Sequence, residues 1–129
     1  MKKIHEDKFK IYYENTDSSG FAYHTAYLSM AERARSNMLN KDFSELTIML
    51  KTNSKFFVVK KIKVDFIKPA KLFDNLDIIT FYIGNSFTSL NLIQKIEKDG
   101  ADVSKIDVQL VWIDGAKGKP IKIPRNIID

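Results

Sequence analysis

The spacing of apolar residues changes from a helical to a strand period after the first third of this 129-residue chain, and this change constrains the fold most. From about His24 to Leu39 the chain contains strong helix formers and neither Gly nor Pro. Apolar residues recur there every three or four positions, which predicts one apolar helix face. After Asn53 the period becomes two, which is typical of strands. The predicted helix face consists of Tyr27, Met30 or Ala31, Ala34 and Met38.

The predicted helix lies between one early strand and four later strands. His24 or Thr25 is the expected N-cap, and a short second helix is expected over 43–50. In the longest strand, alternation places Lys60 in register with an apolar face made of Val58, Ile62, Val64 and Phe66. Lys98-Asp99-Gly100 predicts a hairpin turn, and the chain after Asp114 predicts a loop. The expected strands are 9–14, 56–67, 76–83, 90–96 and 103–113.

No helical pattern separates the four later strands, so they are expected to pair antiparallel. The fold class is therefore α+β, as a single domain over residues 1–129. One long apolar-faced helix and about five strands suggest an antiparallel sheet wrapped around the helix. Such a sheet leaves open edge strands, and pairing of two copies would cover them. We therefore expect a homo-oligomer, at least a dimer.

Composition excludes several kinds of chemistry. The chain has no Cys, which removes disulfides, thiolate nucleophiles, iron–sulfur clusters and Cys-bound zinc. With only two His residues we expect no metal site. The N-terminal stretch has no apolar segment typical of a secretory signal, and no apolar run approaches the roughly 20 residues that a membrane helix needs. We therefore expect a cytoplasmic protein without an integral membrane segment.

The charge balance favours anionic partners. Lys+Arg is 21 and Asp+Glu is 16, a net charge of +5. This sign suits phosphate-bearing groups or an acidic protein, although the many lysines are equally consistent with an AT-rich genome. The aromatic residues follow core patterns and are not interleaved with Arg, so nucleic acid is not an expected partner.

The stretch from Tyr12 to Arg35 carries the candidate chemistry. Asp17 lies in a glycine-bearing turn directly before the helix, whose first N–H groups lack helical partners. Such amides can stabilise an oxyanion, and a carboxylate beside them can attack a carbonyl or activate water. A thioester suits so sparse a site, because its thiolate leaves with little help from an acid. The alternative is that Asp17 is only a turn or capping residue.

This stretch, YYENTDSSGFAYHTAYLSMAERAR, resembles the pattern YYEDTDxxGxxYHxxYxxxxERAR of hotdog-fold acyl-CoA thioesterases. These belong to the 4-hydroxybenzoyl-CoA thioesterase group, and the most similar branch is the YbgC-like one associated with the Tol–Pal system. The resemblance continues through 57–78 and to the Lys119-Pro120 and Ile123-Pro124 end. It implies a sheet curled around one long central helix, assembly as a dimer or homotetramer, and an active site at the dimer interface.

The resemblance also implies roles for individual residues. Asp17 would be the catalytic carboxylate, and a backbone N–H near Tyr23 or His24 would polarise the thioester carbonyl. The His24 side chain would orient substrate or tune Asp17, or else only fix the start of the helix. Phe56, Phe57 and Val59 would come from the neighbouring chain's side of the pocket, or else belong to the core. A cluster of lysines would meet the coenzyme A phosphates, or else form a solvated strand face; it consists of Lys60, Lys61, Lys63, Lys68 and Lys71. The full set of expected substrate-binding residues is Tyr13, Gly20, Tyr27, Phe57, Val59, Lys60 and Lys61.

The expected function is hydrolysis of an acyl-CoA without metal or redox cofactor. Asn15 replaces the first Asp of the family pattern, and Ser18-Ser19 replaces a more usual Ala/Gly pair. Three alternatives remain. The substrate could be an acyl carrier protein thioester; the chain could be a hydroxyacyl dehydratase on the same fold, although the glycine of that motif is missing; or it could be a non-catalytic acyl-CoA-binding or scaffold module. Glu32 and Arg35, three apart on the helix, are expected to be structural and could pair with each other.

Overall fold

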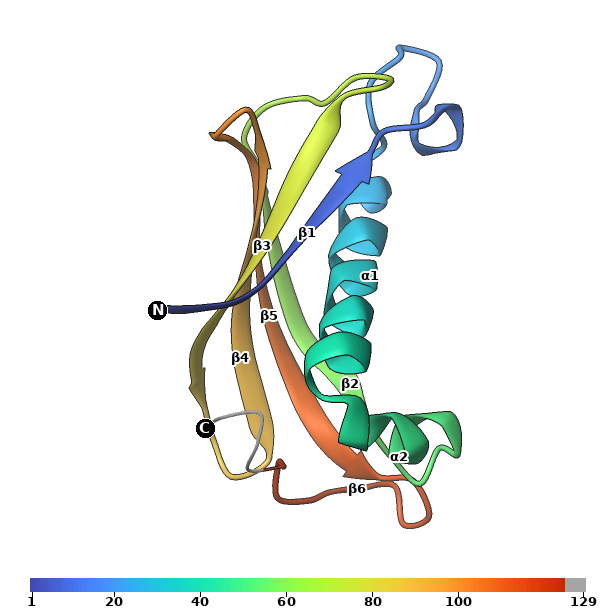
Figure 1. Cartoon of the computed structure of the whole chain (residues 1–129), viewed down its shortest axis with the longest axis vertical. Coiled ribbons are helices and arrows are strands. Elements are labelled where there is room, and N and C mark those ends of the chain that lie inside the picture. Colours follow the sequence, from blue (N-terminus) through green and yellow to red (C-terminus); the bar gives the residue numbers. More distant parts are fainter. Residues whose placement is uncertain (125–129) are drawn as a thin grey trace.

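A computed structural model describes residues 1–124 of the chain (Figure 1). The end of the predicted C-terminal loop, 125–129, lies outside the described residues. The elements in order are β1 (Lys2–Lys10), a 3₁₀ turn (Tyr13–Asn15), α1 (His24–Asp42), a 3₁₀ turn (Ser44–Leu46), α2 (Thr47–Lys51), β2 (Lys55–Phe66), β3 (Asn75–Asn85), β4 (Ser89–Lys98), β5 (Ala101–Asp114) and β6 (Lys119–Pro120).

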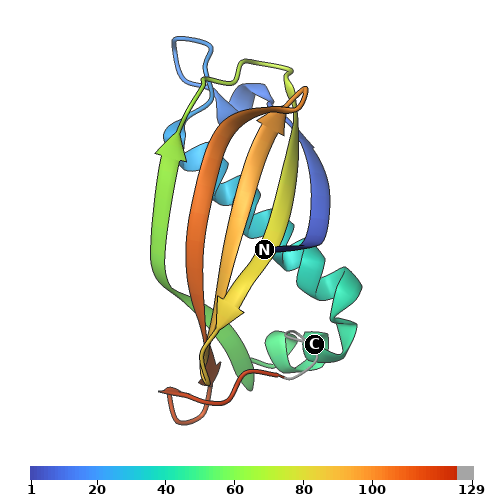
Figure 2. The ribbon, with the colours of Figure 1, turned by 90° about the vertical axis from the view of Figure 1, so that its left-hand side faces the viewer.

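The strands form one antiparallel sheet, as predicted. The order across the sheet is β1-β3-β4-β5-β2, and the short β6 pairs with β5. The predicted hairpin joins β4 to β5, and its residues Asp99 and Gly100 have φ angles of 51° and 80°. The sheet curves, and the 19-residue α1 lies along one of its faces (Figures 1 and 2). β1 and β2 are the two ends of the strand order.

The apolar face of α1 packs on the sheet. All members of the predicted helix face are buried, and Ala31 and Ala34 are completely buried. Their small side chains allow the helix to lie close to the apolar face of the curved sheet. The sheet contributes Leu76, Ile78, Ile96 and Ile106 to the same cluster. This packing fixes the position of the start of α1 relative to the strands.

A β-bulge in β2 changes which of its residues face the helix. Val59 pairs with Leu110, whereas Lys61 pairs with Gln109, so Lys60 is an extra residue in the ladder. Phe57 and Val59 therefore share the face of Ile62, Val64 and Phe66, opposite buried residues of β5. The prediction that Val58 lies on that face was wrong, because strict alternation holds only without a bulge. Because Lys60 is the extra residue of the bulge, simple alternation in the sequence had placed it on the apolar face.

The early strand and the helix start were also placed incorrectly. β1 begins at Lys2 and ends at Lys10, so the predicted strand 9–14 was wrong for most of its length. Asn15 accepts the Tyr12 N–H at 2.9 Å through Oδ1, and this bond favours a 3₁₀ turn over an extended chain. The N-cap of α1 is Tyr23, not His24 or Thr25, and no side chain caps this end.

Candidate active site

Asp17 lies in a closed loop between the 3₁₀ turn and α1. Its N–H donates to the Phe21 carbonyl at 3.1 Å, and its carbonyl accepts the Gly20 N–H at 3.1 Å. Gly20 has a φ of 82°, a conformation that favours glycine. At the base of the loop Thr16 forms a bridge with Ala22. These backbone hydrogen bonds fix the position of the Asp17 Cα in the loop, and with it the direction in which its side chain leaves the backbone.

The loop is anchored to the chain that follows β2. The Ala22 N–H donates to the Ala70 carbonyl at 2.8 Å, and Phe21 forms an antiparallel bridge with Lys71. Both segments lie at the same end of the sheet, beside the start of α1 (Figure 1). Two stretches far apart in sequence thus hold the candidate carboxylate in place.

The Asp17 carboxylate has one engaged and one open oxygen. Oδ1 accepts the Ser19 N–H at 2.8 Å and also the Ser19 hydroxyl. These bonds, the hydroxyl bond first, hold the pKa of the Asp17 carboxyl below its ordinary value because they favour the charged form. Within residues 1–124 no group bonds to Oδ2. An ionised carboxylate with a free oxygen can act as a nucleophile or a base.

In residues 1–124, the first N–H groups of α1 are not used in hydrogen bonds within the protein. The Ala26 N–H donates to the Tyr23 carbonyl at 3.0 Å, whereas no acceptor in the described part of the chain takes the N–H of His24 or Thr25. Unpaired amides at a helix N-terminus carry the positive end of the helix dipole. Such groups can stabilise negative charge on a carbonyl oxygen.

A hollow of about 270 Å³ opens beside the start of α1. His24 meets the Phe66 ring edge-on with 6.4 Å between ring centres, and Tyr27 lies 5.8 Å from the same ring. The Tyr27 hydroxyl accepts the Ala70 N–H at 3.1 Å, and burial raises the pKa of the phenol. The lining consists of Ala22, His24, Tyr27, Phe66, Ile67, Lys68 and Pro69. It does not include Asp17, whose loop reaches the hollow through Ala22.

Within a single chain, only some of the predicted site residues lie close to one another. Asp17, Gly20, Tyr23, His24 and Tyr27 share the loop and the first turns of α1. Tyr13 is on the preceding 3₁₀ turn and is 82% exposed.

The predicted residues of β2 lie elsewhere in the chain. The strand starts beside α2, at the opposite end of the sheet from the start of α1 (Figure 1). Phe57 packs on Trp112 with 4.6 Å between ring centres, and Val59, Lys60 and Lys61 follow it on the open edge. These four residues can join Asp17 only if a second copy supplies them.

The sequence analysis did not assign two residues, Phe66 and Ser19, to the site. Phe66 was assigned only to a strand face, yet it lines the hollow and is 54% exposed. Ser19 was noted only as a departure from the family pattern, yet it binds Asp17 twice. A Ser two residues after an Asp in a turn is a recognisable signal for such bonds.

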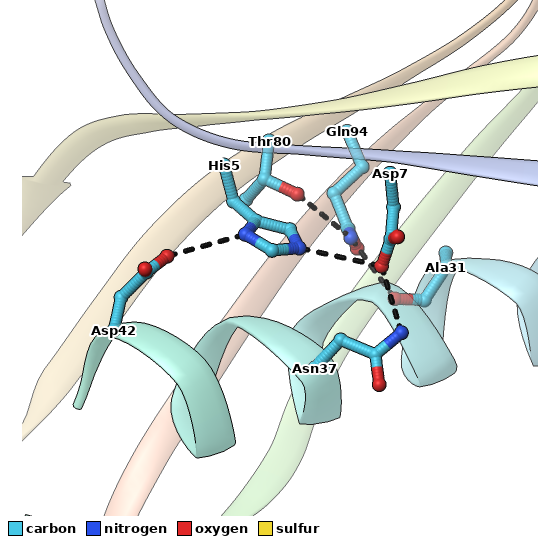
Figure 3. Close-up of polar contacts among 7 residues, drawn as sticks. All are labelled: His5, Asp7, Ala31, Asn37, Asp42, Thr80 and Gln94. Carbon is cyan, nitrogen blue, oxygen red and sulfur yellow. Dashed lines mark hydrogen bonds and ion pairs between the residues drawn. The ribbon is translucent and has the colours of Figure 1, made fainter. Parts of the chain in front are cut away.

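Polar clusters further along α1 are structural (Figure 3). Arg35 is buried and donates from Nη1 to Gln94 Oε1 at 2.7 Å. The predicted Glu32–Arg35 pair is therefore replaced by a contact to the sheet, because Arg35 points into the core. Farther along, both ring nitrogens of His5 lie near carboxylates, Asp42 at 3.2 Å and Asp7 at 3.3 Å. These contacts tie α1 to β1 and β4.

Residues 1–124 contain neither a cluster of metal-binding side chains nor a helix suited to a membrane. No three His, Asp or Glu side chains gather closely enough to hold a metal ion. None of the described helices combines the length and apolar character needed to cross a membrane.

Comparisons with known proteins agree with one another. The family model described as the thioesterase-like superfamily matches residues 12–129. The chain is 36% identical to the acyl-CoA thioester hydrolase YbgC of Escherichia coli O6:H1, covering 92% of this chain and 89% of that protein. It is 32% identical to the acyl-CoA thioesterase YbgC of Haemophilus influenzae, covering 92% and 87%. Its structure is similar to a probable thioesterase from Bartonella henselae, with a TM-score of 0.83, 28% identity and coverage of 93% and 98%.

Proposed function

This chain belongs to the thioesterase-like superfamily, and we propose that it hydrolyses an acyl-CoA to the free acid and coenzyme A. The observation that carries the proposal is the 36% identity to an acyl-CoA thioester hydrolase over 92% of the chain. The geometry supports it, because an ionised carboxylate with a free oxygen lies one short loop before uncovered helix amides.

The chemistry follows from these groups. Asp17 Oδ2 either attacks the thioester carbonyl or takes a proton from a water that attacks it. The N–H of His24 or Thr25 stabilises the negative charge that forms on the carbonyl oxygen. The C–S bond then breaks and coenzyme A leaves as the thiolate. If Asp17 has attacked, water next hydrolyses the acyl–Asp17 anhydride; in both routes one water is consumed and no cofactor is required.

A second copy of the chain would complete the pocket. The β2 edge is open, and its apolar residues Val58, Val59 and Ile62 are 40%, 47% and 39% exposed. Antiparallel pairing of two β2 strands about their midpoints would bring the Phe57 end of one strand beside the Phe66 end of the other. We therefore propose a dimer, or a tetramer built from dimers, in which α1 is the central helix of each hotdog unit.

Dimerisation can be tested separately from catalysis. Ile62→Asp places a charge on the open edge and should convert the protein to a monomer in light scattering coupled to gel filtration. The matched variant Ile83→Asp changes a residue of similar exposure on β3, which has strands on both sides. A dimer that persists with Ile62→Asp would contradict pairing through β2.

The activity test is thiol release from a panel of acyl-CoAs, short to long aliphatic plus benzoyl and hydroxybenzoyl. Asp17→Ala should reduce kcat/KM by about a hundredfold or more while the protein stays folded. Glu14→Gln is the control, because Glu14 is an exposed carboxylate of the preceding turn. Activity that survives in Asp17→Ala would overturn the assigned mechanism.

Adding acyl carrier protein thioesters to the panel separates the carrier-protein and binding alternatives. Release only from acyl carrier protein thioesters would identify an acidic protein as substrate carrier, which the net charge of +5 suits. No release from any thioester would favour a binding or scaffold role. A cytoplasmic location and a link to the Tol–Pal system stay predictions.

A further inference from the structure

The Asp17 loop contains a ring of hydrogen bonds that passes through one side-chain hydroxyl. Asp17 N–H donates to the Phe21 carbonyl, and Phe21 N–H donates to Ser19 Oγ at 3.3 Å. Because Ser19 Oγ accepts from Phe21, its own hydrogen is free to point at the carboxylate. Ser19 then donates to Asp17 Oδ1 from both its hydroxyl and its N–H.

We infer that Ser19 is a positioning residue that holds the Asp17 carboxylate through Oδ1 and directs Oδ2 to the substrate. This inference rests on the proposed function of Asp17. A carboxylate held at one oxygen by two donors has lost most of its freedom to rotate, so its other oxygen keeps one orientation. The backbone N–H is present whatever the side chain at position 19, so the hydroxyl is the contribution of this residue.

Asp17 has few competing electrostatic neighbours. The titratable groups on the segments next to its loop are Tyr13 and Glu14 on the preceding turn, Tyr23 and His24 at the start of α1, and Lys68, Lys71 and Asp74 after β2. In the described structure no ion pair joins any of them to Asp17. Instead, the Ser19 hydroxyl is the largest single cause that lowers the pKa of the Asp17 carboxyl.

The test compares Ser19→Ala with the wild type across pH. Loss of the hydroxyl should move the acid limb of kcat/KM to higher pH by about half a pH unit or more. The plateau kcat should fall about threefold or more, since the carboxylate can rotate, while KM changes less. Ser19→Thr keeps a hydroxyl and should restore both values. Ser18→Ala is the matched control, because Ser18 is exposed and outside the hydrogen-bond ring.

A second readout does not depend on turnover. The ¹³C signal of the Asp17 carboxyl, assigned by its loss in Asp17→Asn, should titrate at higher pH in Ser19→Ala than in the wild type. An unchanged titration midpoint and an unchanged acid limb would overturn the positioning role. If Asp17→Ala abolishes activity while Ser19→Ala changes nothing, only this inference fails; if Asp17→Ala stays active, the proposed mechanism itself fails.

Discussion

Replacing Gln94 by Leu should show how much the hydrogen bonds of one buried side chain contribute to the free energy of unfolding. Gln94 lies on β4 and is fully buried. Its Oε1 accepts from Arg35 Nη1 at 2.7 Å. Its Nε2 donates to the Ala31 carbonyl at 2.9 Å and to Thr80 Oγ1 at 3.2 Å (Figure 3). Leu has a comparable volume but makes none of these bonds, so the Arg35 guanidinium stays buried without this acceptor.

The magnitude follows from the bonds lost. A hydrogen bond to a charged group contributes about 1.5–3 kcal/mol, and each neutral bond about 1 kcal/mol. Burying the apolar Leu side chain returns roughly 1 kcal/mol. Burial lowers the pKa of the Arg35 guanidinium, but an arginine remains charged at neutral pH, so the unpaired charge persists. We expect Gln94→Leu to lower the free energy of unfolding by about 3 kcal/mol.

Urea unfolding followed by circular dichroism, at fixed protein concentration, measures this change. Thr80→Val is the matched control, because it removes only one partner of Gln94 and should cost about 1 kcal/mol or less. The double variant Arg35→Leu/Gln94→Leu removes the charge together with its acceptor and should show a coupling energy of at least about 1 kcal/mol. A Gln94→Leu protein within about 1 kcal/mol of the wild type would refute the reasoning.

Three further predictions concern the ionisation of Asp17, the Tyr27–Ala70 contact and the close approach at Gly115. Because its pKa is depressed, Asp17 should stay ionised as pH falls, and the acid limb of kcat/KM should lie below pH 3.8, the ordinary value; a limb at higher pH would contradict the Ser19 contacts. Tyr27→Phe leaves the Ala70 N–H unpaired and should cost about 1–2 kcal/mol in urea unfolding, whereas no loss would mean that water replaces the hydroxyl. In Gly115→Ala the new Cβ would lie 2.0 Å from the Asn53 carbonyl oxygen, so a loss of about 2 kcal/mol is expected; Gly118→Ala has open space and should lose only about 1 kcal/mol through its φ of 64°.

Much of the fold was predictable because its signals are local. The helix face around Ala31 and Ala34, the antiparallel pairing of the later strands and the Asp99-Gly100 hairpin follow from residue spacing and turn chemistry. The bulge at Lys60 was not predictable from alternation, because the pairing of Val59 with Leu110 and of Lys61 with Gln109 is set by β5. The 3₁₀ turn was missed because the segment 9–14, FKIYYE, mixes aromatic and β-branched residues and so resembles a strand up to Glu14.

The sequence by itself determined which residue carries the candidate chemistry. Asp17, the turn around Gly20 and the helix that follows are contiguous, so their order along the chain already places a carboxylate near free amides. Only the tertiary structure decided what surrounds them. Phe66 reaches the hollow because β2 ends beside α1, and Arg35 meets Gln94 because the helix packs on β4. Such contacts join residues that are far apart in the chain, and they depend on sheet register and helix packing, which local spacing does not encode.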